Sequence, residues 1–325
     1  MIIAVAQSPV VFQSQWVAHC SRSVALRPEW IVLRFLVMVS LLASLAGCGE
    51  TVLSPIGPVG AAERTILLNA LAIMLAIVVP TIVATLAFAW WYRSGNSRAR
   101  YLPNFQYSGQ LELLVWSVPA LVVLFLGGIA WTGSHELDPA EPLEWVSTTK
   151  GVKPLEVEVV SLDWKWLFIY PEQQVASINR LVVPTGVPLH MRLTSATVMN
   201  VFFVPRLGSE IYSMSGMATQ INLQADTPGI YPGLSANFSG DGFSDMHFTL
   251  EAVDSGQFNA WVTRSKASGD ELNDPTYKQL LRQTSNIQPY TYRAVATGLF
   301  DRIVSLQLPS GDGPPHTPSP KAGEP

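Results

Sequence analysis

Cysteine is almost absent from this chain of 325 residues, which contains only Cys20 and Cys48. Nothing after residue 48 can therefore form a disulfide or supply a thiolate to a metal. Charged residues make up only 14% of the chain, and the formal net charge is −4. So few charges are unusual for a soluble domain, and the negative balance offers no basic surface for nucleic acid.

A short apolar segment at residues 35–46 follows three arginines within residues 22–34. This order is typical of a secretion signal, and the run is too short to span a bilayer. It ends in Leu45-Ala46-Gly47-Cys48, which resembles the lipobox of bacterial lipoproteins, where cleavage precedes a cysteine that becomes acylated. We predict a signal peptide at residues 1–47, with an overextended start, and lipid attachment at Cys48. An ordinary cleavage site beside a chance cysteine is the alternative.

Two longer hydrophobic runs follow, at residues 66–91 and 113–132, and neither contains a charged residue. Each is long enough to cross a hydrocarbon core of roughly 30 Å. The loop at residues 93–110 holds three arginines and no acidic residue. The positive-inside rule places this loop in the cytoplasm and both flanks outside. We predict a transmembrane hairpin at residues 65–133, after a periplasmic segment at residues 48–64.

Beyond Asp138-Pro139 the hydrophobic pattern changes its period. Apolar residues alternate with polar ones at residues 155–160 and 189–194, and shorter alternating runs surround Ile221 and Phe248. Short runs of period two, separated by proline and glycine, are typical of a β-sandwich or barrel. Residues 140–256 are therefore predicted to form an all-β domain.

Helical signals return near the C-terminus. Asp254-Ser255 can cap a helix, and Asp274-Pro275 provides an N-cap followed by proline at the first helical position. We predict a short helical arm at residues 257–305. The remaining residues, 306–325, are rich in proline and glycine from Pro309 onward and lack an apolar period, which predicts a disordered tail.

The stretch YPGLSANFSGDGFSDM at residues 231–246 resembles the copper loop of subunit II of the haem–copper oxidases. That loop reads Tyr-x-Gly-x-Cys-x-Glu-x-Cys-x-x-x-His-x-x-Met and holds a two-copper centre, CuA. On this frame only the methionine is kept, and a second ligand histidine of the family corresponds to a residue in SATVMNVF, residues 195–202. The six positions are Asn200, Ser235, Asn237, Ser239, Phe243 and Met246. Copper in such sites needs thiolate and imidazole ligands, so the resemblance implies a cupredoxin-like sandwich that has lost its copper.

The aromatic segment SLDWKWLFIYP at residues 161–171 is also similar to subunit II of this family. Together with VMNVFFVPRLGSEIY at residues 198–212, its spelling resembles the ubiquinol-oxidase branch. The resemblance implies a cytochrome bo-type ubiquinol oxidase, a proton-pumping enzyme of the bacterial inner membrane. The complete fold would be a membrane-anchored, two-helix transmembrane hairpin, then the all-β cupredoxin-like sandwich and the short helical C-terminal arm. The aromatic segment would pack between the sandwich and a membrane partner subunit.

In that family the haems, the copper of the oxygen site and the quinol site lie in subunit I. The resemblance therefore implies that this chain binds no cofactor and contributes to assembly and stability. Its partners would be subunit I, the other oxidase subunits and the lipid bilayer, with ubiquinol acting at the level of the complex. Cytochrome c and nucleic acid would not be partners.

Glu112 stands at the edge of the second hydrophobic run. Subunit II of related oxidases carries a glutamate shortly before a tryptophan and a proline, at the mouth of a proton-uptake channel of subunit I. Glu112, Trp116 and Pro119 repeat this order, so the resemblance makes Glu112 a candidate proton-uptake entrance. The alternative is a helix-end carboxylate favoured by the helix dipole.

Two other functions fit the sequence. Loss of copper is equally expected in subunit II of a menaquinol oxidase. A membrane-tethered cupredoxin-like protein with a binding or assembly role could also keep the sandwich without its redox centre.

Overall fold

The computed structural model describes residues 52–311, except 101, 103, 144, 145 and 147–150, together with the isolated residues 37 and 40. Apart from residues 37 and 40, the predicted signal peptide lies outside the described residues, and so do Cys48 and residues 312–325 of the predicted tail. The described residues from 52 onward belong to one compact unit.

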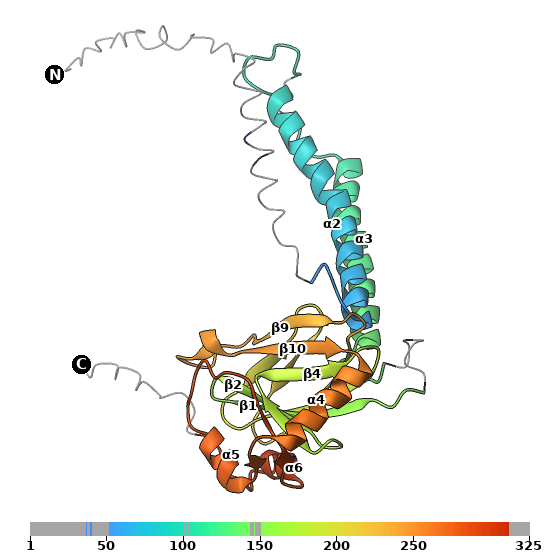
Figure 1. The fold of residues 1–325 in the computed structure, drawn as a ribbon. Helices are drawn as coiled ribbons and strands as arrows, with labels where there is room; N and C mark the ends of the chain where they lie inside the picture. Colours follow the sequence, from blue (N-terminus) through green and yellow to red (C-terminus); the bar gives the residue numbers. More distant parts are fainter. Residues whose placement is uncertain are drawn as a thin grey trace, which may run out of the picture. The chain divides into compact units, whose positions relative to one another are not determined.

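Two long apolar helices open this unit, and they run side by side (Figure 1). Helix α2 spans Pro58–Trp91 and α3 spans Gly109–Glu136. Both are long and apolar enough to cross a membrane, and neither buries its most apolar window within the chain. Such side chains require lipid or a partner subunit around them. The hairpin was predicted at residues 65–133, but α2 begins earlier, at Pro58, and α3 ends later, at Glu136. Helix α2 continues through Pro80, and α3 continues through Pro119.

A close approach joins the start of α2 to the end of α3. Gly133 is the buried residue of α3, and a Cβ atom there would lie 2.7 Å from the Cδ1 atom of Ile66. A larger residue at position 133 would push the two helices apart.

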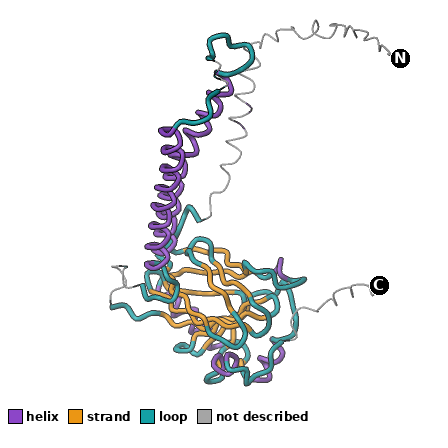
Figure 2. Tube along the Cα trace, turned by 180° about the vertical axis from the view of Figure 1, so that it is seen from behind, coloured by secondary structure: helices purple, strands orange, loops and turns teal. Residues whose placement is uncertain are grey.

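Two β-sheets pack face to face in the remainder of the unit (Figure 2). One has the strand order β12-β3-β2-β1-β5-β8, and the other has the order β4-β10-β9-β6-β7. Neighbouring strands are antiparallel except for the pairs β1–β5 and β4–β10. The bounds are β1 Leu155–Leu162, β2 Lys165–Tyr170, β3 Val175–Ile178, β4 Arg180–Pro184, β5 Pro188–Ser195, β6 Asn200–Phe203, β7 Glu210–Ser213, β8 Thr219–Gln224, β9 Gly229–Ser235, β10 His247–Val253 and β12 Tyr290–Tyr292.

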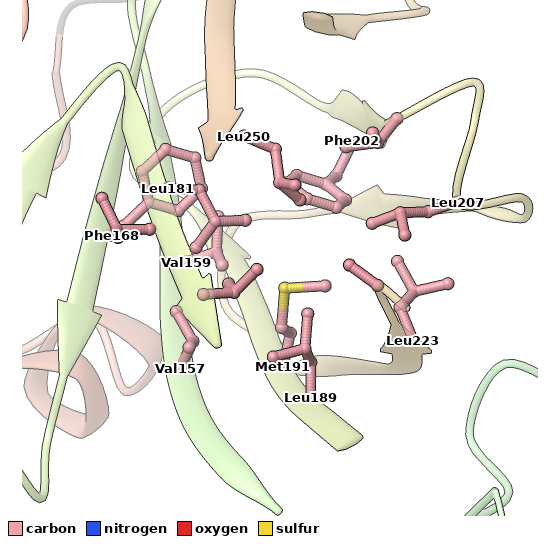
Figure 3. Packing of buried hydrophobic residues seen from close by; sticks show 14 of the residues in the cluster. Val157, Val159, Phe168, Leu181, Leu189, Met191, Phe202, Leu207, Leu223 and Leu250 are labelled. Atoms are coloured by element: carbon pink, nitrogen blue, oxygen red, sulfur yellow. The ribbon is translucent and has the colours of Figure 1, made fainter. Parts of the chain in front are cut away.

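The main hydrophobic core lies between the two sheets. Alternate residues of each strand point inward, so Val159, Phe168 and Met191 from one sheet meet Phe202 and Leu250 from the other (Figure 3). The rings of Phe202 and Phe248 stack with centroids 5.1 Å apart. The alternation in the sequence therefore predicts this core correctly.

The aromatic segment is buried inside this chain, and the expectation that it packs against a membrane partner is wrong for β2. Trp166, Phe168 and Tyr170 are fully buried between the sheets. Leu167 and Ile169 point to the opposite face, where they join a second core with the C-terminal arm. Period two sends successive β2 residues to opposite faces, and this chain covers both faces itself.

The C-terminal arm consists of α4 Ser255–Ala267, α5 Asp274–Leu280 and α6 Leu299–Val304. A two-residue strand, β11 Glu271–Leu272, pairs with β13 Ala294–Val295. The arm also contributes β12, which pairs with β3 at the edge of the six-stranded sheet. The sequence did not predict this added strand.

The predicted helix caps are correct for α4 and displaced by one residue for α5. The side chain of Asp254 accepts a hydrogen bond from the backbone nitrogen of Gln257. In α5 the cap is Asn273, whose side-chain oxygen accepts from the nitrogen of Thr276. Asp274 and Pro275 therefore occupy the first turn of the helix. Asparagine and aspartate are equally good N-caps, so the sequence alone does not separate the two positions.

The described part of the predicted tail is attached to the domain. The backbone nitrogens of Gln307 and Leu308 donate to the carbonyl oxygen of Arg302. The backbone nitrogen of Gly311 donates to the carbonyl oxygen of Ala196. Residues 306–311 therefore continue the arm rather than begin a disordered tail.

Candidate functional site

The six positions of the copper frame gather at one end of the five-stranded sheet. Asn200 begins β6, Ser235 ends β9, and Met246 directly precedes β10. Strand β9 lies between β6 and β10 and is antiparallel to both, which brings these three strand ends together. The loop from residue 236 to residue 245 carries Asn237, Ser239 and the 3₁₀ turn Phe243–Asp245.

Asn200 and Ser235 form a buried hydrogen-bonded pair. The Ser235 hydroxyl donates to the side-chain oxygen of Asn200 across 3.1 Å, and the Asn200 amide donates to the carbonyl oxygen of Val198 across 3.2 Å. Asn200 is 1% exposed and Ser235 is 4% exposed. Buried polar groups need such partners to avoid a desolvation cost, so these two residues satisfy each other without a metal.

Ser239 and Met246 form the second buried pair. The Ser239 hydroxyl lies 3.8 Å from the Met246 sulfur, which is a weak acceptor. The carbonyl oxygen of Ser239 accepts a hydrogen bond of 3.1 Å from the indole nitrogen of Trp164. A Cβ atom at Gly242 would collide with the Trp164 ring, so glycine there allows the loop to close over the indole.

Asn237 and Phe243 are both partly exposed. The Asn237 amide donates to the carbonyl oxygen of Met199 across 3.0 Å. The Phe243 ring packs edge-on against Phe238, with centroids 5.6 Å apart, and Phe238 is 74% exposed. Asn237 therefore joins the loop to the segment before β6 through its amide, and Phe243 contacts Phe238 within the loop.

The side chains at this site do not fit copper. Hydroxyl, amide and phenyl groups replace the thiolates, carboxylate and imidazoles of the copper frame, and only the Met246 thioether is a soft ligand. Over the described ranges there is also no group of three or more histidine, cysteine, aspartate and glutamate residues placed to hold a metal ion. The loop frame is present, whereas its copper ligands are absent.

Glu112 lies in the first turn of α3. Trp116 and Pro119 follow it by four and seven residues, which places all three along one side of the helix. Glu112 and Trp116 are exposed in the isolated chain, so this side of α3 is available to a partner within the membrane.

Sequence reasoning missed a junction between α2 and the sandwich. The Glu63 carboxylate accepts hydrogen bonds from the backbone nitrogen and the hydroxyl of Ser209, across 2.8 and 2.6 Å. The nitrogen of Gly60 donates to the carbonyl oxygen of Leu207. The available signal was an acidic residue, Glu63, placed just before a long uncharged run.

Two family models match this chain. The periplasmic domain of cytochrome c oxidase subunit II matches residues 155–253, and the COX aromatic rich motif matches residues 266–308. The chain is 49% identical over 261 residues to ubiquinol oxidase subunit 2 of Acetobacter aceti, covering 80% of this chain and 84% of that protein. The chain belongs to the ubiquinol oxidase subunit 2 family. The predicted family is therefore confirmed.

Two further relatives extend this result. Cytochrome bo(3) ubiquinol oxidase subunit 2 of Pseudomonas aeruginosa is 44% identical, covering 82% of this chain and 80% of that protein. Quinol oxidase subunit 2 of Bacillus cereus is 35% identical, with coverage of 76% and 84%. Family membership and the fold confirm the predicted membrane-anchored hairpin, cupredoxin-like sandwich and helical arm.

Proposed function

We propose that this chain is the subunit II of a proton-pumping ubiquinol:oxygen oxidoreductase and that it binds no cofactor. The observation that carries the proposal is the buried Asn200–Ser235 pair, which occupies two former ligand positions and satisfies its own hydrogen bonds. The chain then contributes to assembly and stability of the complex. The haems, copper and quinol site reside in subunit I.

The identity of the electron donor follows from the missing ligands. A cytochrome c docked on the outer domain would need a metal centre to receive its electrons, and the residues around Ser239 and Met246 cannot hold copper. Quinol dissolved in the bilayer reaches subunit I without such a relay. Two relatives of 49% and 44% identity are named ubiquinol oxidase subunits, which supports ubiquinol as the quinol.

Purification of the complex through a tag on this chain tests the proposal. The preparation should contain haem, should consume oxygen with a short-chain ubiquinol, and should be inert toward reduced cytochrome c at low salt. Comparable oxidation of cytochrome c would contradict it. Purification of a haem-free protein would favour the alternative, a membrane-tethered assembly or binding protein.

We further propose a membrane orientation and a lipid anchor for this chain. We place the chain in the bacterial inner membrane, with the cytoplasmic loop at residues 93–110, two periplasmic flanks and an acyl group on Cys48. Intact mass spectrometry of the membrane-extracted chain should reveal loss of residues 1–47 and a lipid increment. An unmodified Cys48 would refute the anchor. Two spanning helices bind a membrane far more strongly than acyl chains, so Cys48→Ala should leave the chain membrane-bound.

We also propose a role for Glu112 in proton uptake. Its place in the first turn of α3, on the same side as Trp116 and Pro119, supports a role at the proton-uptake entrance of subunit I. The cytoplasmic position of this helix end, inferred from the arginines of the preceding loop, agrees with uptake from that side.

A further inference from the structure

A cavity of about 480 Å³ lies between the sandwich and the C-terminal arm, and none of its lining residues belongs to the copper loop. Its walls come from the start of β2, from α5 and the loop after it, and from β12. Figure 1 labels β2 and α5, which form two of these walls. Cavities that bind small molecules typically enclose about 300 to 1,000 Å³, so this one has the size of a ligand site.

Lys165 is the charged group at the inner wall of this cavity, and it is only 1% exposed. Its ammonium group donates to the carbonyl oxygen of Arg282 across 2.7 Å and to the hydroxyl of Thr284 across 2.6 Å. Both acceptors are neutral. An ammonium group has three protons, so one donor remains for an occupant of the cavity.

No described residue places a carboxylate within 4.0 Å of the Lys165 ammonium. The nearby acid Asp163 accepts the hydroxyl of Thr197 across 2.6 Å instead. Burial lowers the pKa of Lys165 to about 8, and Asp163 opposes this shift. Asp163 therefore acts on the ammonium without direct contact. A buried charge that lacks a contacting counter-charge is costly, and an anion in the cavity would supply that contact.

The rest of the cavity is partly apolar and carries one negative charge. Tyr290 and Tyr292 form part of its wall, with hydroxyls 3.2 Å apart, together with Leu280 and Ile287. Asp270 lies on the side that the cavity shares with a neighbouring depression, whereas Lys165 does not border that depression. A ligand with one carboxylate and a compact apolar body matches this distribution, and a second carboxylate would meet Asp270.

We propose that this cavity binds a small organic monocarboxylate, with its carboxylate on the Lys165 ammonium and its body against Tyr290 and Tyr292. Charge-assisted hydrogen bonds to an ammonium are stronger than neutral ones, so Lys165 dominates the affinity. The site is independent of quinol oxidation and of the copper loop, and it would take its ligand from the compartment that the outer domain faces.

Calorimetric titration of the purified full chain in detergent tests the site, with benzoate as the probe. Benzoate should bind saturably, whereas benzamide, its neutral analogue, and terephthalate, a dicarboxylate, should bind at least about tenfold more weakly. Lys165→Met should lose benzoate binding by at least about tenfold. The matched control is Lys153→Met, because Lys153 is an exposed lysine paired with Glu172.

Absence of saturable benzoate binding at millimolar concentrations would overturn the proposal, and so would equal binding by Lys165→Met or by benzamide. A second measurement covers the case in which Lys165→Met does not fold. Raising the pH of the wild-type chain from about 7 to about 9.5 crosses the Lys165 pKa of about 8. Benzoate binding should then fall while near-ultraviolet circular dichroism stays constant. Binding that is unchanged over this range would contradict a role for the ammonium.

Discussion

Two buried tyrosines show how the same residue type can have opposite energetic consequences. The Tyr170 hydroxyl donates to the carbonyl oxygen of Val182 across 3.0 Å and accepts from its nitrogen across 2.8 Å. Tyr277 is also fully buried, but its hydroxyl has no hydrogen-bond partner in the described part of the chain. A buried hydroxyl stabilises the fold only where it is paired.

Replacing each tyrosine by phenylalanine tests this difference. Tyr170→Phe should destabilise the chain by about 1–2 kcal/mol, because it leaves both backbone groups of Val182 unpaired. Tyr277→Phe should be neutral or stabilise by up to about 1 kcal/mol, because it removes an unpaired group. Thermal unfolding followed by near-ultraviolet circular dichroism measures both. Equal losses of stability in the two variants would mean that the Tyr277 hydroxyl is hydrogen-bonded in the folded chain.

Glu158 gives the β-sandwich a pH-dependent stability. Burial raises the pKa of Glu158 to about 7, against the opposing effect of Arg192, whose guanidinium lies 3.4 Å away; Asp301 and Glu156 add to the rise. Between its ordinary pKa and about 7, the folded state binds more protons at Glu158 than the unfolded state does. Stability therefore falls as the pH rises through this range.

The corresponding prediction compares stability at about pH 5 and about pH 8. The wild-type chain should lose about 1 kcal/mol more stability than Glu158→Gln over this interval, a figure reduced for solvent screening because the Glu158 side chain is partly exposed. Glu172→Gln is the control, because Glu172 is a surface residue paired with Lys153. Parallel pH profiles for wild type and Glu158→Gln would show that Glu158 does not titrate in this range.

At the scale of elements, the junction of α2 with the sandwich depends on one backbone conformation. Gly208 has a φ of +92°, and a Cβ atom there would lie 2.7 Å from the Glu63 carboxylate and 2.8 Å from the nitrogen of Gly60. The junction is extended by Arg206, whose guanidinium donates to the carbonyl oxygen of Ser54 and lies 5.0 Å from the ring centroid of Tyr231.

Gly208→Ala should therefore destabilise the chain more than a glycine replacement that changes only backbone strain. Gly186 is the matched control, with a φ of +71° and no atom within 4 Å of the added Cβ. Gly186→Ala should cost about 1 kcal/mol from strain alone, and Gly208→Ala about 3 kcal/mol because the added methyl also displaces Glu63. Thermal unfolding measures both variants. Equal losses would mean that the junction contributes little to stability.

The elements with a clear period could be predicted from the sequence. Alternation at residues 155–160 and 189–194 marks β1 and β5, and the uncharged runs mark α2 and α3. Strand β2 is different, because a continuous apolar run indicates burial on both faces without identifying what covers them. The C-terminal arm covers one face, which is a long-range contact that no local pattern specifies. Strand β12 was missed for the same reason.

The copper loop could be predicted in part. Its frame identifies the six positions, and their residue types exclude copper chemistry. The hydrogen bond between Asn200 and Ser235 depends on which strand ends meet, and this follows from the order β10-β9-β6 in the sheet. The pairing of Glu63 with Ser209 spans 146 residues of sequence and requires the tertiary fold in the same way.

At the scale of the whole molecule, α3 places acidic residues at its two ends, Glu112 and Glu136. If Glu112 serves proton uptake, Glu112→Gln should lower ubiquinol-driven oxygen consumption by roughly three- to tenfold, about 1 kcal/mol in activation free energy. Glu136→Gln should leave turnover unchanged, and haem content should match wild type in both. Unchanged turnover in Glu112→Gln would leave it as a helix-end carboxylate.

The sandwich keeps the frame of a copper site without its ligands. We would measure this by copper titration of the purified chain, in a background of Cys20→Ser and Cys48→Ser that removes the native thiols. The comparison is with a variant that restores the family ligands through Asn200→His, Ser235→Cys, Asn237→Glu, Ser239→Cys and Phe243→His.

The chain with native residues at these positions should bind no stoichiometric copper and should give no thiolate-to-copper absorption. The restored variant should show both, because its strand ends already meet at the right place and thiolate and imidazole supply the missing ligands. Tight stoichiometric copper binding by the chain with native residues at these positions would contradict the loss of the copper site.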